Sequence, residues 1–174
     1  MGFRLTYATM FNPPESMHAS FDAALLAVAA SLGGRHALFI NGVDECRAHS
    51  RSLVSPNDTT LQLGEFSLAS IEDVDNAVHH AQAAYPAWRA LSAKQRADCL
   101  RRVADIMEQR VYHIAVALCL EVGKNRMEAL GEAQETVDFF RQYADDFENA
   151  NGFDIKLPDD PLTGIESTNR SILR

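Results

Sequence analysis

The sequence of 174 residues is long enough for one domain with a buried core and too short for several domains. Hydrophobic residues make up 47% of the chain and charged residues 23%, a balance that excludes global disorder. The net charge of −8 would repel a phosphate backbone, so the composition also argues against nucleic acid as a partner.

The N-terminal residues are predicted to form an arm followed by one amphipathic helix. Residues Met1 to Pro14 are expected to be extended, because Pro13 and Pro14 disfavour a helix there. From Ser16 onward a helix is predicted to continue as far as Gly33-Gly34, where glycine allows the chain to turn. Its apolar residues recur at helical spacing: Met17, Phe21, Leu25, Val28 and Leu32.

Two β-hairpins are predicted next. The short β run from Ala37 to Ile40 is followed by Asn41-Gly42, a pair that favours a tight hairpin because both residues tolerate positive φ. Leu53-Val54 and the run from Leu61 to Leu68 indicate a second hairpin, joined by a turn-forming stretch that begins at Ser55. The predicted β content is therefore local and small.

A long helix is predicted to begin at Ser70, with Asp73 placed where an acid can complete the N-terminal cap. Pro86 is expected to end this helix, which leaves Trp88 in the following connection. The predicted buried stripe of the helix consists of Ile71, Val74, Val78, Ala81 and Tyr85.

Ser92 and Gln95 form a capping box for the next helix. Its predicted buried stripe consists of Leu100, Val103, Met107 and Val111. Basic residues on the same helix are expected to form a solvated face rather than a phosphate cradle, pairing with nearby acids. The basic residues are Arg96, Arg101 and Arg102, and the acids are Asp98 and Asp105.

The stretch from Glu121 to Asn125, Glu-Val-Gly-Lys-Asn, separates an apolar helical run from a long acidic helix. The apolar run extends from Ile114 to Leu120, and Gly123 is expected to end it in a left-handed cap. The acidic helix should reach about Asn149. Its predicted buried stripe consists of Met127, Leu130, Val137, Phe140, Ala144 and Phe147.

The last residues read as two strands, Phe153 to Leu157 and Ile165 to Leu173. Because two isolated strands are only marginally stable in water, this ribbon should dock on something else. We therefore predict a fold that is mostly α with small β hairpins, divided at residue 150. Residues 1–150 form a helical N-terminal lobe, and residues 151–174 form a β arm that we expect to be truncated.

Patterns alone point to no catalytic centre. Cys46, Cys99 and Cys119 are odd in number and widely spaced, which argues against a disulfide framework or zinc site and for a reducing cytoplasm. Cys99 and Cys119 are expected to be core residues. His79 and His80 point about 100° apart on a helix and cannot share one metal ion, so we predict no metal site. The sequence contains no dinucleotide fingerprint, P-loop or nucleophile elbow.

A series of motifs nevertheless resembles the N-terminal part of the aldehyde dehydrogenase superfamily over residues 38–174. In order, the motifs are Phe39-Ile-Asn-Gly42, Asp73-Val-Asp75 to Ala77, Tyr85-Pro-Ala-Trp88, Arg96 to Leu100, Glu121-Val-Gly-Lys-Asn125 and Glu135-Thr-Val-Asp-Phe139. Within the superfamily the chain resembles the 1-pyrroline-5-carboxylate dehydrogenases, also called L-glutamate 5-semialdehyde dehydrogenases. The features that carry this are the helix before Phe39, the Glu128-Ala129 pair and the stretch from Asn169 to Arg174.

The resemblance implies an NAD-dependent oxidation of L-glutamate 5-semialdehyde to L-glutamate in proline catabolism, through a nucleophilic cysteine and a glutamate-activated water. It also implies that this cysteine, this glutamate and the Rossmann core belong downstream of residue 174. We therefore expect the chain to be an N-terminal segment of the aldehyde dehydrogenase fold, which is α/β in the full-length protein. On this reading it has no catalytic residue of its own, binds no NAD and is inactive alone.

The same resemblance places one substrate-binding residue in this chain, Glu135. A carboxylate there could accept charge-assisted hydrogen bonds from the substrate's ammonium group. The alternative is a surface acid in a row with Glu128 and Glu132, and it stays open. Phe139, one turn on, could line the pocket, although we expect it to be a core residue.

The resemblance further implies that the β arm packs on a neighbouring subunit, so we expect a homo-oligomer formed through residues 151–174 and exposed helix faces. Two other functions stay open at this point. The chain could be a free-standing helical interaction module without a catalytic role, or it could belong to another aldehyde dehydrogenase subfamily. The preference for NAD over NADP is also open.

Overall fold

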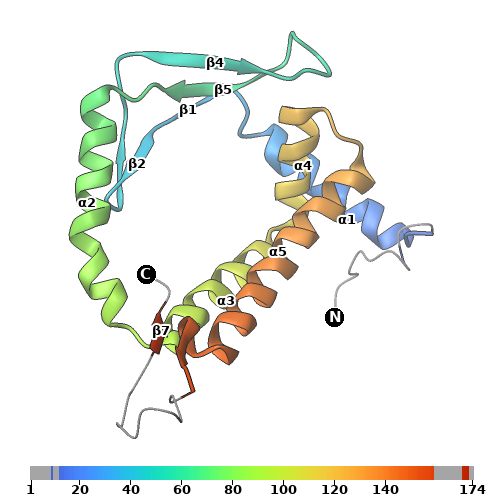
Figure 1. The fold of residues 1–174 in the computed structure, drawn as a ribbon. Helices are drawn as coiled ribbons and strands as arrows, with labels where there is room; N and C mark the ends of the chain where they lie inside the picture. Colours follow the sequence, from blue (N-terminus) through green and yellow to red (C-terminus); the bar gives the residue numbers. More distant parts are fainter. Residues whose placement is uncertain (1–8, 10–11, 159–169, 173–174) are drawn as a thin grey trace, which may run out of the picture.

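A computed structural model gives the structure of the chain and describes residues 9, 12–158 and 170–172. Helices dominate these residues (Figure 1), so the predicted mostly helical fold class is confirmed. In chain order the elements are α1 (Glu15–Ala29), β1 (Gly34–His36), β2 (Leu38–Ile40), β3 (Val43–Glu45), β4 (Ser50–Val54), β5 (Gln62–Ser67), α2 (Ile71–Ala90), α3 (Ala93–Gln109), α4 (Val111–Val122), α5 (Arg126–Asn149), the 3-10 helix η1 (Asn151–Phe153), β6 (Asp154–Lys156) and β7 (Arg170–Ile172).

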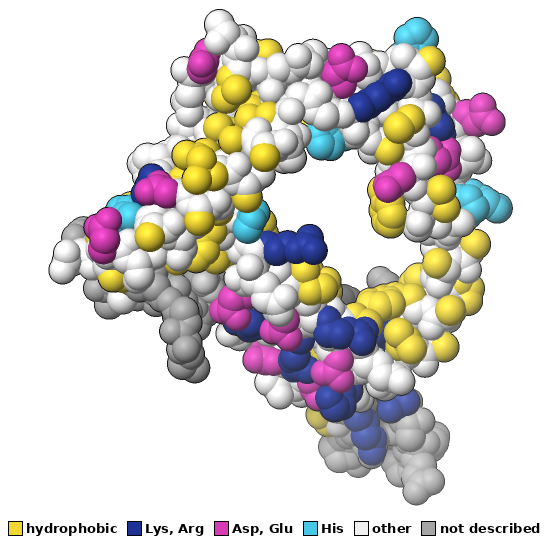
Figure 2. Space-filling model, turned by 180° about the vertical axis from the view of Figure 1, so that it is seen from behind, with side chains coloured by type: hydrophobic (Ala, Val, Ile, Leu, Met, Phe, Trp, Pro, Cys, Tyr) yellow, Lys and Arg dark blue, Asp and Glu magenta, His cyan; other side chains and the backbone are white. Residues whose placement is uncertain are grey.

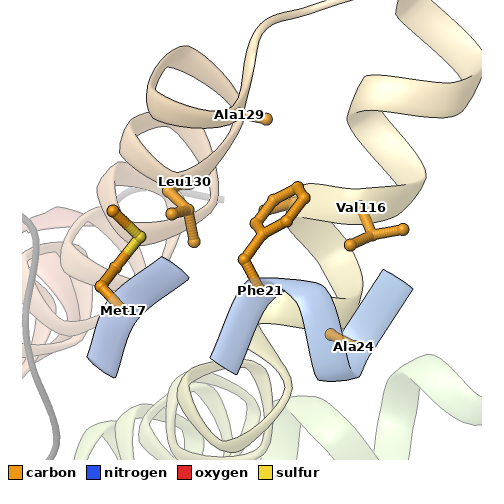
Figure 3. Packing of buried hydrophobic residues seen from close by; sticks show 7 residues of the cluster. Met17, Phe21, Ala24, Val116, Ala129 and Leu130 are labelled. Carbon is orange, nitrogen blue, oxygen red and sulfur yellow. The ribbon is translucent and has the colours of Figure 1, made fainter. Parts of the chain in front are cut away.

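Helices α1, α4 and α5 enclose a cluster of buried apolar side chains (Figure 3). Met17 and Phe21 of α1 meet Val116 of α4 and Leu130 of α5, and all four are buried. Ala24 takes the buried position that the spacing assigned to Leu25, which is 37% exposed. The first helix of the chain is thus held by helices that follow it by about ninety residues, and this long-range packing fixes α5 in place.

Helices α3 and α5 pack side by side through small residues. Ala97 and Ala104 of α3 are buried, as are Val137 and Ala144 of α5. The stripe predicted for α5 is therefore confirmed at its centre, whereas the stripe predicted for α3 is wrong at Val103, which is 40% exposed. Small side chains at the contact let the helix axes approach, and the larger residues of α3 then lie beside the contact rather than in it.

Three short strands form a sheet in the order β1-β5-β4, with β1 parallel and β4 antiparallel to β5. The β4–β5 hairpin was predicted, but β1 was not, because three residues that include a glycine give no strand signal. The β2–β3 hairpin is confirmed, and its turn residues Asn41 and Gly42 have φ angles of 51° and 79°.

Helix α2 begins as predicted and ends later than predicted. The hydroxyl of Ser70 accepts from the Asp73 N–H at 3.2 Å, and the carboxylate of Asp73 accepts from the Ser70 N–H at 2.9 Å. Pro86 does not end the helix, which continues through Trp88 to Ala90. A proline near the end of a helix removes one hydrogen bond, and the remaining bonds of the last turn can still form.

The apolar stripe predicted to be buried on α2 is exposed instead. Ile71 is 83% exposed, Val74 55%, Val78 51% and Tyr85 52%. Figure 1 shows the reason, since α2 stands apart from the other helices and connects the sheet to α3. The chain thereby closes a ring, and Figure 2 shows the opening that it surrounds.

The end of the described chain is a short ribbon in which β6 pairs antiparallel with β7. It follows η1, where Gly152 has a φ of 70°. Most of the predicted arm at residues 1–14 and of the predicted strand at residues 165–173 lies outside the described residues. No described helix is both long enough and apolar enough to cross a membrane.

Candidate functional site

The junction between α4 and α5 is held by backbone caps. Gly123 has a φ of 81°, and its N–H donates to the Cys119 carbonyl at 3.2 Å, which ends α4 as predicted. The side chain of Asn57 donates to the same carbonyl at 3.1 Å. Asn125 caps α5, because its side-chain oxygen accepts from the backbone N–H groups two and three residues ahead at 3.1 and 3.0 Å. The direction in which α5 leaves the junction is therefore fixed.

Three acids follow the junction on α5, and they differ in their partners. Lys124 forms an ion pair with Glu132. The carboxylates of Glu128 and Glu135 are exposed and form no hydrogen bond or ion pair with any residue that the structure describes. Glu135 therefore has a charge available for an external ligand, and so has Glu128.

Aromatic rings distinguish the surroundings of Glu135. Phe139 and Tyr143 follow it by one and two helical turns, and their rings stack with centroids 5.6 Å apart and planes 11° apart. The expectation that Phe139 is a core residue is wrong, because Phe139 is 46% exposed and Tyr143 is 59% exposed. A carboxylate beside exposed aromatic rings is chemistry that can bind an ammonium group.

The three cysteines are free thiols at separate places. Cys46 is exposed, whereas Cys99 and Cys119 are half-buried rather than fully buried core residues. Burial raises the pKa of the Cys119 thiol, which disfavours the thiolate that a nucleophile requires.

The two adjacent histidines of α2 contact each other through their rings. The rings of His79 and His80 lie edge to face with centroids 5.9 Å apart. Within residues 9, 12–158 and 170–172, no three side chains of the metal-binding types gather at one point.

One arginine of the predicted basic patch forms ion pairs that link α3 to α5. Arg101 contacts Asp145 at 2.6 Å and Glu148 at 2.6 Å, in addition to its neighbour on α3. These carboxylates raise the pKa of Arg101 further above its usual value. Asp105 pairs with Arg141 at 2.9 Å and not with the patch, which corrects that predicted partner. The arginine pairs thus reinforce the α3–α5 contact.

The other two arginines of the patch form no ion pair with any acid that the structure describes. The guanidinium of Arg96 lies 4.8 Å from the ring centroid of Phe147, and Arg102 donates to the Cys99 sulfur at 3.1 Å. Neither arrangement gathers the several donors that a phosphate cradle requires.

One cavity of about 190 Å³ lies between α1, the β1–β5 strands and α4. It is lined by Val28, Ser31, Leu32, His36, Leu63, Phe66, Ala117, Leu120 and Glu121. Glu135 and the two exposed aromatic residues of α5 are not among them, so the cavity is separate from the candidate site.

Comparison with known protein families gives a match to the aldehyde dehydrogenase family over residues 43–169. Among curated relatives, the 1-pyrroline-5-carboxylate dehydrogenase of Staphylococcus saprophyticus is 38% identical over 125 residues. That match covers 72% of this chain and 24% of the relative. The alpha-ketoglutaric semialdehyde dehydrogenase of Bacillus subtilis is 38% identical over 109 residues, which cover 61% of this chain and 22% of the relative. The chain thus spans about a quarter of the length of these relatives.

Solved structures share the fold. A 1-pyrroline-5-carboxylate dehydrogenase from Thermus with bound NAD superposes with a TM-score of 0.81 and 23% identity, over 92% of this chain and 31% of that chain. A proline utilization A protein from Bdellovibrio bacteriovorus superposes with a TM-score of 0.79 and 26% identity, over 87% of this chain and 15% of that chain. In its matches the chain corresponds to the N-terminal part of the longer enzymes.

Proposed function

Because the chain belongs to the aldehyde dehydrogenase family, we propose that it is the N-terminal segment of an NAD-dependent enzyme that oxidises L-glutamate 5-semialdehyde to L-glutamate. This aldehyde is the open form of 1-pyrroline-5-carboxylate. The proposal is carried by the 38% identity to a 1-pyrroline-5-carboxylate dehydrogenase over 125 residues. Since the chain spans about a quarter of that relative, the oxidation itself is assigned to the complete enzyme and not to this segment.

Glu135 is the residue of this segment that we assign to substrate binding. Its carboxylate is exposed and has no partner among the described residues, so an incoming ammonium group displaces no existing ion pair. Phe139 and Tyr143 continue the same face and can shield that contact from water, which strengthens a charge-assisted hydrogen bond. The site would therefore hold the amino end of an amino-acid aldehyde.

A second substrate is suggested by the relative named alpha-ketoglutaric semialdehyde dehydrogenase, which is 38% identical over 109 residues. That substrate has a carbonyl oxygen where glutamate semialdehyde has an ammonium group. A carboxylate accepts hydrogen bonds and repels another acceptor, so Glu135 opposes the oxo compound and favours the amino compound. The residue thus supports the first proposal over the second.

We place the NAD site outside this segment, and three capped helix N-termini support this, although the starts of α1 and α4 have no side-chain cap. A dinucleotide phosphate usually binds free N–H groups at the start of a helix. Here Ser70 and Asp73 cap α2, Ser92 and Gln95 cap α3, and Asn125 caps α5. Asp73 would also repel a phosphate. The capped N–H groups and the Asp73 carboxylate therefore do not fit the phosphates of the cofactor.

A cytoplasmic location remains our expectation for the enzyme.

The role of Glu135 can be tested in a chimera that joins residues 1–174 to the part of the Staphylococcus saprophyticus relative that follows its matched segment. We expect Glu135→Gln to raise KM for glutamate semialdehyde about 10- to 100-fold, because the ammonium group then meets a neutral amide instead of a carboxylate. KM for a simple aliphatic aldehyde should change less than about twofold. Steady-state kinetics with both aldehydes measures the difference.

Glu128→Gln is the matched control, since Glu128 is an exposed acid on the same helix and has no partner among the described residues. It should leave KM for both aldehydes unchanged. Equal effects of Glu135→Gln on the two aldehydes would remove its assigned role. The chimera should bind NAD and the 174-residue chain should not, which isothermal titration calorimetry can measure.

A further inference from the structure

The cavity of about 190 Å³ between α1, the β1–β5 strands and α4 has an apolar interior. An engineered apolar cavity of roughly 150 Å³ stays free of water and accepts a benzene molecule. This cavity therefore has room for a ligand with a body of about that size. The apolar lining comes from three parts of the chain and consists of Val28, Leu32, Leu63, Phe66, Ala117 and Leu120.

One wall of the cavity is aromatic and is fixed by the sheet. His36 of β1 and Phe66 of β5 are partners in the parallel register, and their rings stack with centroids 4.5 Å apart and planes 15° apart. The imidazole lies over Gly64, where the Cβ of any other residue would come within 2.8 Å of the ring. The wall thus has its shape before a ligand arrives, which lowers the cost of binding.

The polar side chains that line the cavity present mainly hydrogen-bond acceptors. The hydroxyl of Ser31 already donates to the Val28 carbonyl at 2.8 Å, so only its lone pairs are left for a ligand. The carboxylate of Glu121 is exposed and has no partner among the residues that the structure describes. A neutral imidazole, as His36 can supply, adds one acceptor nitrogen. The cavity thus offers acceptors and one negative charge beside an apolar interior.

We infer that this cavity binds a small organic cation, namely a primary ammonium group joined to an apolar body of about one aromatic ring. An ammonium group carries a positive charge and three donors, which match the carboxylate and the other acceptors. An anion of the same shape would instead meet Glu121 and a chain of net charge −8. The cavity is separate from Glu135, so the inference goes beyond the proposed function and does not depend on it.

The first test titrates the 174-residue chain with phenethylammonium and follows the backbone amides by NMR. We expect saturable shifts that are largest in residues 28–32, 63–66 and 117–121. The neutral analogue phenethyl alcohol should bind about three- to tenfold more weakly, since an exposed charge pair contributes modestly. Ammonium chloride lacks the apolar body and should give no saturable shift at these amides.

The second test uses variants, with affinities read only from the amides of the cavity. Glu121→Gln should weaken phenethylammonium about three- to tenfold and leave phenethyl alcohol unchanged, because only the charge is lost. Its Tm should stay within about 2 °C of wild type, since Glu121 is exposed. Ala117→Leu fills part of the cavity and should weaken both probes. Glu128→Gln and Glu135→Gln change acids outside the lining and should leave both affinities unchanged.

Three results would overturn the inference. One is the absence of saturable binding of phenethylammonium up to about 10 mM. Another is equal affinity for phenethylammonium and phenethyl alcohol, which would leave the cavity without a preference for a cation. The third is a loss of affinity in Glu135→Gln but not in Glu121→Gln, which would move the site to α5. No readout uses turnover, so failure of the proposed oxidation would not change these results.

Discussion

At the scale of single residues, the pair of Arg47 and Asp73 links the connection after β3 to the first turn of α2. The Asp73 side chain accepts from Arg47 and from the N–H of Ser70, and the residue is only 5% exposed. The hydrogen bonds from Arg47, and then those from Ser70, hold the pKa of Asp73 well below its usual range. The charged form of the carboxylate is therefore the form that stabilises the fold.

This pair predicts a particular dependence of stability on pH. Because the folded-state pKa of Asp73 lies below its unfolded value of about 3.9, the contribution is fully present above pH 4 and is lost as pH falls further. Asp73→Asn should therefore lower the Tm at pH 7, and the difference from wild type should shrink between about pH 4 and pH 2. Thermal unfolding followed by circular dichroism measures both. The exposed neighbour variant Glu72→Gln is the control, and a Tm difference for Asp73→Asn that stays constant with pH would contradict the assignment.

At the scale of elements, the start of α5 depends on one side chain. Asn125 satisfies two backbone N–H groups that have no partner within the helix. Asn125→Ala should lower the free energy of unfolding by about 1 kcal/mol, whereas Asn125→Asp should keep most of it because it retains the accepting oxygen. Urea denaturation compares the three proteins. Equal losses in both variants would show that the cap contributes little.

The sequence predicted those elements whose signals are local. The Asn41-Gly42 hairpin and the caps at Ser70 and Ser92 each depend on a few neighbouring residues, and all form as expected. The burial of α2 was wrong because an apolar pattern predicts that a face needs a partner but not that the partner lies within the same chain. Strand β1 was missed because its pairing with β5 is set by tertiary contact and not by its own residues.

The candidate site was less accessible to sequence reasoning. Glu135 is one of several acids on α5, and spacing alone could not separate it from Glu128 or Glu132. Only the resemblance to a family identified it. The structure adds that Glu132 is paired with Lys124 and that Phe139 is exposed beside Glu135. Neither fact follows from helical periodicity, because both depend on which faces of α5 the other helices cover.

At the scale of the whole molecule, we propose that residues 151–174 form a β arm distinct from the helical lobe of residues 1–150 and that this arm joins copies of the chain. Phe153, Ile155 and Leu157 are 39%, 50% and 42% exposed in and around β6. A two-stranded ribbon with exposed apolar residues is marginally stable alone, and pairing with a second copy would stabilise it.

The 174-residue chain should therefore self-associate at high concentration, which multi-angle light scattering measures. Ile155→Lys should reduce the average mass, because a charge on the ribbon opposes an apolar contact. Val43→Lys is the control, since it changes a similarly exposed apolar residue in the separate β2–β3 hairpin. A monodisperse monomer at all concentrations would contradict the proposal.

The closed ring has a consequence for how the chain tolerates backbone cleavage. A protease that nicks α2 would open the circle without releasing either piece. The first piece would retain α1, whose Met17 and Phe21 are packed against α4 and α5 of the second piece. Cleavage would thus break the covalent link between the sheet and α3. The contacts of α1 with α4 and α5 would keep the two pieces associated.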